Sequence, residues 1–398
     1  MTPNLSKRAS AIPPSPIRKL VPFAEEAKKR GIHVYHLNIG QPDIETPEPM
    51  LKAVREFTGK VIHYCHSQGH DSYLDSLVSY YKKHNIILEK PMINVTTGGS
   101  EAIVFAFMSA MDAGDEVIIP EPFYTNYNGF AIMAGVKINP VTTSGENGFH
   151  LPAIDVFEKK INDKTKAILL CNPNNPTGTV YTRKELDAVA SLCKKHNLWL
   201  LTDEVYREFI YESSDYTSAL LLPGMEDRVI MMDSISKRYS ACGARIGCIV
   251  SRNKQVMEAC LKLGQARLCS PLVDQVLATA AEDLPEDYMD NTVDEYRSRR
   301  DVVFEGLEKI PGLVAIKPSG AFYNIVKLPV DSAEKFAQWL LTDFEKDGKT
   351  VMLAPAAGFY ATEGLGVQEA RIAYVLCKEE LIDAMNLLKV AIEQYNSK

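Results

Sequence analysis

The sequence lacks the features that would place it in a membrane, on a nucleic acid or around a metal ion. Its uncharged runs, such as 102–111, are shorter than the roughly 20 apolar residues that span a bilayer. A net charge of −7 provides no basic face for phosphate backbones or acidic lipids. The eight cysteines form no C-x-x-C pair and no His–Cys cluster at zinc spacing, so we expect free thiols and no metal site.

The N-terminal residues also lack the continuous apolar core of a signal peptide. Lys7, Arg8 and several prolines interrupt this stretch. Free thiols are typical of reducing compartments. We therefore predict a soluble cytoplasmic protein that binds neither nucleic acid nor membrane.

The length and pattern of the chain predict an α/β protein with two domains. A chain of 398 residues is too long for one hydrophobic core. Between residues 93 and 250, short apolar runs alternate with helical stretches, which is typical of a mainly parallel sheet covered by helices. The helices expected there are 100–111 and 183–197, the second begun by a capping box of Thr182 and Glu185. The expected strands are 93–97, 116–119, 137–141, 167–171, 198–202, 229–233 and 246–251.

The pattern changes after residue 251 to longer helical stretches, of which 286–309 is the clearest. The strand-like segments 321–326 and 371–376, followed by a helix, predict a smaller α+β domain. The proline-rich first 49 residues have no such pattern and are expected to pack on it. We predict a large domain over 49–290 and a small domain formed by 1–48 and 291–398.

Two expected strand ends carry loops that fit either a ligand or a plain turn. Ligands of open α/β sheets bind beyond the carboxyl ends of the strands. The strand 93–97 runs into Gly98, Gly99 and Ser100 at a helix start, which suits an anion or a tight turn with a capping serine. The strand 167–171 runs into 172–178, which would either present the amide of Asn175 or form a rigid turn.

The two other informative strand ends carry ionisable groups. Asp203 follows an apolar strand, where a carboxylate needs a cationic partner such as a protonated pyridine nitrogen, unless it caps a helix. Ser234, Ser236 and Lys237 follow the strand 229–233, and Arg245 comes eight residues after the lysine. This lysine is either a solvated surface charge or a Schiff-base nucleophile whose pKa a nearby cation lowers. Together the four strand ends offer phosphate donors, an amide, an acid and an amine.

In order and spacing, these segments resemble the fold-type I aminotransferases of class I/II, the group that includes aspartate aminotransferase. The resemblance implies the fold of pyridoxal-phosphate-dependent transferases, with pyridoxal 5′-phosphate as cofactor. It also implies ping-pong transfer of an amino group from an L-amino acid to a 2-oxo acid, with 2-oxoglutarate as the expected acceptor. The matching segments extend over nearly the whole chain and are 37–43, 98–102, 122–124, 174–178, 203–206, 234–237, 243–247 and 370–372.

The resemblance further implies a role for individual residues around the cofactor. Lys237 would carry it as a Schiff base, and Asp203 would pair with its ring nitrogen. Asn175 and Tyr206 would hydrogen-bond its phenolate oxygen, and Tyr124 would stack on the ring. Tyr206 is counted with Lys237 and Asp203 as catalytic. The other expected cofactor-binding residues are Gly99, Ser100, Glu101, Ser234, Ser236 and Arg245.

For the substrate, the resemblance implies contacts with Gly40 and Asn175, and a two-pronged grip of Arg371 on the α-carboxylate. Tyr64 matches a family tyrosine that reaches the cofactor phosphate of the neighbouring subunit. A homodimer with shared active sites is therefore expected.

The amino donor stays open at this stage. Some bacterial aspartate aminotransferases of this subgroup have a lysine at the position of Ser100 that helps to bind the distal carboxylate; here Arg18 or Lys19 could serve instead. Aspartate, alanine, aromatic and branched-chain donors all stay open.

Three rival functions remain. One is a pyridoxal-phosphate-dependent C–S lyase on the same fold, and another is a cofactor-binding regulatory module without turnover. The retention of Lys237, Asp203 and Arg371, without an appended DNA-binding segment, speaks against the module. A nucleotide-binding Rossmann protein is disfavoured because Gly98 and Gly99 do not extend to G-x-G-x-x-G.

Overall fold

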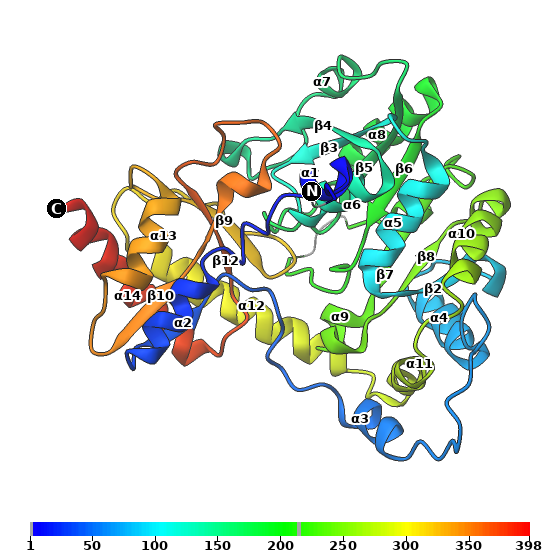
Figure 1. Ribbon diagram of the computed structural model, residues 1–398, viewed down its shortest axis with the longest axis horizontal. Helices are drawn as coiled ribbons and strands as arrows, with labels where there is room; N and C mark the ends of the chain where they lie inside the picture. Colours follow the sequence, from blue (N-terminus) through cyan, green and yellow to red (C-terminus); the bar gives the residue numbers. More distant parts are fainter. Residues whose placement is uncertain (1–2, 213–215) are drawn as a thin grey trace.

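A seven-stranded sheet forms the centre of the computed structural model, which describes residues 3–212 and 216–398 (Figure 1). The strand order is β2–β8–β7–β6–β5–β3–β4. Only β8 runs antiparallel to its neighbours, and the other pairs are parallel. The strands are β2 (Ile93–Thr97), β3 (Glu116–Glu121), β4 (Lys137–Thr142), β5 (Thr165–Cys171), β6 (Trp199–Asp203), β7 (Val229–Ser234) and β8 (Ile246–Val250).

Both faces of this sheet are buried, because helices cover each side. Alternate strand residues serve the two faces: in β7, Met231 packs in the core under α4 and α8, and Met232 packs in the core under α5, α6 and α10. The helices on the first side are α4 (Asp71–Lys83) and α8 (Arg183–His196), the latter begun by the expected capping box. Those on the second side are α5 (Gly98–Ala110), α6 (Asn126–Ala134) and α10 (Lys254–Ala266). All seven expected strands are confirmed.

A second group of elements packs around its own hydrophobic core beside the large sheet (Figure 1). Its three-stranded antiparallel sheet has the order β11–β12–β9, with β9 (Tyr323–Lys327), β11 (Ala354–Pro355) and β12 (Glu369–Ala373). Its helices are α12 (Tyr288–Leu307), α13 (Ala333–Thr342) and α14 (Lys378–Asn396). The expected strand 371–376 was placed too late: β12 ends at Ala373, which pairs with Tyr323, the first residue of β9.

The N-terminal part of the chain joins this second group. Strand β1 (His33–His36) pairs in parallel with β10 (Lys349–Met352), and α2 (Val21–Lys29) packs its buried alanines against α13. The domain boundaries at 48/49 and 290/291 stay a proposal that these pairings favour. The remaining helices are α1 (Lys7–Ala11), α3 (Glu48–Arg55), α7 (Ile154–Glu158), α9 (Ile235–Arg238) and α11 (Leu272–Thr279).

No helix within the described ranges combines the length and the apolar character needed to cross a bilayer.

Candidate active site

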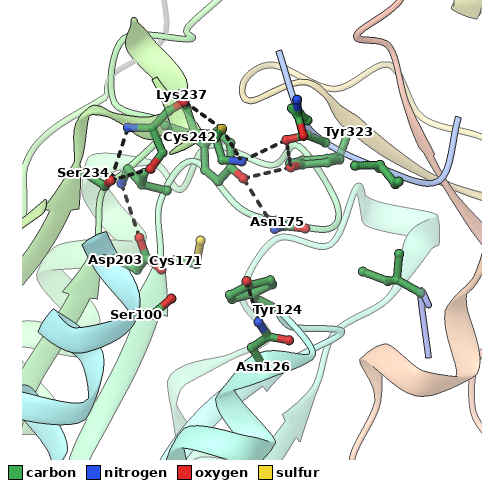
Figure 2. Close-up of a pocket in the computed structure, with 18 of the residues that line it drawn as sticks. Ser100, Tyr124, Asn126, Cys171, Asn175, Asp203, Ser234, Lys237, Cys242 and Tyr323 are labelled. Atoms are coloured by element: carbon green, nitrogen blue, oxygen red, sulfur yellow. Dashed lines mark hydrogen bonds between the residues drawn. The ribbon is translucent and has the colours of Figure 1, made fainter. Parts of the chain in front are cut away.

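A cavity of about 540 Å³ lies between the strand ends of the large sheet and the smaller group of elements (Figure 2). The large sheet contributes the residues that follow β2, β5, β6 and β7, so the four informative strand ends do meet at one place. The smaller group contributes residues of β9 and β12 and the segment 38–41. The N-terminal residues Ser15, Ile17 and Arg18 complete one wall.

Lys237 reaches this cavity from α9, the short helix that follows β7. The helix is held at its start by the Ser234 hydroxyl, which accepts from the Ser236 N–H at 3.2 Å. Behind it, Arg238 is buried and donates to both carboxylate oxygens of Asp233 at 3.0 and 2.9 Å. The Lys237 amine donates to the Gly40 carbonyl oxygen at 2.8 Å. A primary amine is thus fixed at the cavity wall, within reach of a ligand.

Asp203, at the end of β6, is a buried carboxylate without a cationic partner in the described residues. Its Oδ2 accepts from the Tyr127 hydroxyl at 2.8 Å, and its Oδ1 accepts from the Val205 N–H at 3.3 Å. Burial raises the pKa of Asp203 to about 6, and the hydrogen bond from Tyr127 opposes that rise. No helix begins here, so the alternative of a capping aspartate is wrong. A protonated ring nitrogen would supply the missing cation.

One end of the cavity is built for an anion. Gly99 and Ser100 lie in the first turn of α5, where N–H groups have no partner within the helix. The hydroxyls of Ser234 and Ser236 lie 2.8 Å apart and line the same space. Arg245 adds a guanidinium, and a side chain on Gly98 would collide with it. None of these groups is acidic, which suits a phosphate.

Arg371 forms a second, separate anion site. It lies on β12, 2% exposed, and donates through Nη1 to the Asn175 side-chain oxygen at 3.0 Å and through Nη2 to the Asn38 carbonyl at 2.6 Å. Its Nε has no partner, and no carboxylate contacts it in the part of the chain that the structure describes. Burial lowers the pKa of this guanidinium. A ligand carboxylate would satisfy it.

Two tyrosines that the sequence singled out border the space between these groups. The buried Tyr206 hydroxyl lies 2.9 Å from the Tyr323 hydroxyl and accepts from the Asn175 amide at 3.5 Å. Tyr124 is half-buried, and its hydroxyl accepts from the Asn126 amide at 2.8 Å. Burial raises the pKa of Tyr124 to about 12, so this phenol is neutral. Figure 2 shows Tyr124 facing the space into which Lys237 projects.

Two of the expected site residues do not line the cavity. The Glu101 carboxylate accepts from the Thr97 N–H at 2.7 Å and pairs with Arg267 at 3.0 Å, so we no longer propose it as a cofactor ligand. Tyr64 lies on the loop before α4 and is 75% exposed. Within one chain it contributes nothing to this cavity, and its role across a subunit interface stays a prediction.

The structure adds site residues for which the sequence reasoning gave no role. Asn38 and Tyr323 hold Arg371 and Tyr206, but neither follows a recognisable strand of the large sheet. Tyr127 lies in the first turn of α6, three residues after Tyr124. No group of three or more His, Cys, Asp or Glu side chains in 3–212 and 216–398 is arranged to hold a metal ion.

Of the two cations that the sequence left open, the structure brings only one to the cavity. Arg18 lines it and forms no ion pair with a described residue. Lys19 turns away and pairs with Glu334 of α13 at 2.6 Å.

Comparison with known proteins gives one consistent result. The family model "Aminotransferase class I and II" matches residues 32–346. Aromatic-amino-acid aminotransferase 2 of Thermococcus litoralis is 32% identical and spans 98% of both chains. Aspartate aminotransferase of Thermotoga maritima is 32% identical over 97% of this chain and 98% of its own. A single mutant of Thermus thermophilus aspartate aminotransferase superposes with a TM-score of 0.89 at 27% identity, covering 98% and 100% of the two chains. These names share a reaction and differ in the amino donor.

Proposed function

The chain belongs to the class I and II aminotransferase family, and on that premise we propose that its cavity binds pyridoxal 5′-phosphate through Lys237. The chain is an enzyme that transfers an amino group from an amino acid to a 2-oxo acid. The main observation behind the proposed residue roles is that Lys237, Asp203 and Arg371 line one cavity. The amine comes from α9 after β7, the acid from the end of β6 and the guanidinium from β12.

The residues present fit this cofactor in two independent respects. Asp203 is a buried carboxylate with no cationic partner among the described residues, and a protonated ring nitrogen would provide one. The anion site of Gly99, Ser100, Ser234, Ser236 and Arg245 contains donors and no acid, which suits the phosphate. When bound, the cofactor supplies a ring that withdraws electrons and so stabilises negative charge at the substrate's Cα.

The protein's own contribution is to position groups and to move a proton. Arg371 would hold the α-carboxylate through its fork, with Asn175 fixing the plane of the guanidinium. Lys237 would accept the Cα proton as a general base and then, as a general acid, deliver it to C4′ of the cofactor, the carbon that keeps the amino group, and not back to Cα. Asp203 would keep a proton on the ring nitrogen. The Tyr206 hydroxyl would donate a hydrogen bond to the ring oxygen. Tyr124 would cover the ring face.

We extend the proposal to the acceptor, which we assign as a dicarboxylic 2-oxo acid such as 2-oxoglutarate. Four cations line the cavity, and Asp203 is the only carboxylate among its described lining residues. Lys237, Arg245 and Arg371 already have partners in the proposed complex. Arg18 is the fourth, and a second substrate carboxylate would balance its charge.

Two finer features are part of this proposal. We propose a homodimer in which Tyr64 reaches the partner's site, because Tyr64 is exposed together with the apolar Val61 and Ile62 at 71% and 68%. A cytoplasmic location is proposed from the free cysteines.

A screen of amino donors with 2-oxoglutarate tests the proposed function. Purified protein loaded with pyridoxal 5′-phosphate should form glutamate with at least one acidic, aromatic or aliphatic donor. Release of pyruvate and ammonia from cysteine-type substrates without any 2-oxo acid would identify a lyase instead. Cofactor binding without turnover of any donor would identify a regulatory module.

A further inference from the structure

We infer that Tyr323 is a positioning residue that joins the proposed cofactor contact of Tyr206 to the carboxylate site of Arg371. The inference rests on the proposed function of this cavity. Tyr323 is the first residue of β9, and its partner in the sheet register is Ala373 of β12, two residues after Arg371. The side chain is 2% exposed and lines the cavity (Figure 2).

The Tyr323 hydroxyl has one good hydrogen-bond partner. It lies 2.9 Å from the Tyr206 hydroxyl and 3.5 Å from the Gly40 carbonyl oxygen. That carbonyl also accepts from the Lys237 amine at 2.8 Å. The short contact with Tyr206 is therefore the stronger of the two.

The direction of this hydrogen bond follows from the role of Tyr206. A phenol has one proton to donate and two lone pairs to accept with. If Tyr206 donates to the ring oxygen of the cofactor, it cannot also donate to Tyr323, so Tyr323 must be the donor. A donor behind Tyr206 polarises its O–H group and strengthens its bond to the cofactor.

The Tyr323 ring has a separate contact with Arg371. The guanidinium carbon lies 4.5 Å from the ring centroid, and no carboxylate of the described chain balances its charge. The ring face attracts the buried cation. The hydroxyl occupies the space that a Cβ at position 40 would need, which explains the glycine there. The Tyr323 side chain thus contacts Tyr206, Arg371 and Gly40, and it joins these three parts of the cavity.

Replacing Tyr323 by phenylalanine removes the hydroxyl and keeps the ring, so the contributions of the two groups can be measured separately. We expect Tyr323→Phe to raise the midpoint of the pH titration of the bound cofactor's visible absorption band by a few tenths of a unit. A weaker donor at Tyr206 leaves more negative charge on the cofactor oxygen, which favours the protonated form of the chromophore. Tyr206→Phe should raise the midpoint further. The matched control is Tyr374→Phe, because that tyrosine is buried, donates to the Ala321 carbonyl at 3.3 Å, lies against Tyr211 and does not line the cavity.

The double variant is decisive. If Tyr323 acts through Tyr206, then Tyr206→Phe with Tyr323→Phe should have the midpoint of Tyr206→Phe alone. Additive shifts, or an equal shift in Tyr374→Phe, would overturn the inference and leave the proposed function intact. A wild-type protein that shows no visible band with pyridoxal 5′-phosphate would overturn both.

The contact with Arg371 has its own measurement. Tyr323→Phe keeps the ring and should bind an unreactive carboxylate such as maleate as the wild type does. Tyr323→Leu removes the ring and should weaken maleate binding about fivefold, by titration calorimetry on the cofactor-loaded protein. Equal affinities for all three proteins would overturn this part of the inference.

Discussion

Replacing Asp203 by asparagine should stabilise the cofactor-free protein and at the same time weaken its function. Burial raises the pKa of this carboxyl group from 3.8 to about 6. A rise of about two units corresponds to about 3 kcal/mol, an order-of-magnitude cost of keeping the charge buried without a cation. Asparagine removes the charge and keeps an oxygen that can accept from Tyr127. An unfolding free energy higher by about 1–3 kcal/mol is expected above pH 6.

The effect should depend on pH in a defined window. The folded protein holds the Asp203 proton more tightly than the unfolded chain, so stability from this group falls as pH rises from about 4 to about 6. Below that window both states are protonated, and the variant should match the wild type at this site. Above it the whole difference should be present and constant.

Urea unfolding of the cofactor-free proteins across this pH range measures the difference. Asp233→Asn is the matched control, because Asp233 is also a buried aspartate and lies near the end of the neighbouring strand β7. Although burial opposes it, Arg238 and Arg207 hold the pKa of Asp233 below its usual value. Asp233→Asn should therefore lower the free energy of unfolding, whereas Asp203→Asn should raise it.

The functional half of the prediction uses the cofactor-loaded protein. Asp203→Asn should slow single-turnover amino transfer about a hundredfold or more, because nothing then holds the ring proton. If cofactor-free Asp203→Asn is no more stable than wild type above pH 6, or transfers amino groups at the wild-type rate, the reasoning is refuted.

Three further predictions follow from the same cavity. Arg371→Lys should slow transfer to a similar degree for every donor and acceptor, because a lysine cannot form the fork; a loss confined to acidic donors in single-turnover kinetics would show that Arg371 reads a distal carboxylate. Arg18→Gln should raise the KM for 2-oxoglutarate about fivefold and leave that for pyruvate unchanged. Lys19→Gln removes one positive charge at the next position and should leave the KM for 2-oxoglutarate and the KM for pyruvate unchanged. Equal effects of Arg18→Gln and Lys19→Gln would refute the role of Arg18. Mixing Tyr64→Phe with Lys237→Ala subunits should restore activity in the hybrids, and confirmed hybrids without activity would remove Tyr64 from the partner's site.

The sequence predicts the large sheet well because its strands are buried on both faces and lie between clear turn signals. Expected strand ends such as 93–97 and 229–233 bring Ser100 and Lys237 to the same cavity, since the carboxyl ends of such strands meet at one edge of the sheet. The positions of these strand ends can be predicted because the alternation of apolar runs and helical stretches is a local pattern in the sequence.

The rest of the site depends on contacts between distant segments, which no local pattern encodes. Tyr323 reaches Tyr206 only because β9 and the loop after β6 meet in the folded chain. The orientation of Glu101 is decided by Arg267, a residue far away in sequence. The separation of Arg18 from Lys19 depends on the position of Glu334. Residue types at one position cannot reveal which of two neighbouring cations faces a cavity.

The hydrogen bond from Arg371 to the Asn38 carbonyl joins residues 333 positions apart in the chain. During synthesis on the ribosome, the segment 38–41 emerges early and must wait for β12 before its polar groups find their partners. A nascent chain that already contains Lys237 and the whole large sheet still has no carboxylate site. The proposed carboxylate site can therefore form only after most of the chain has been translated.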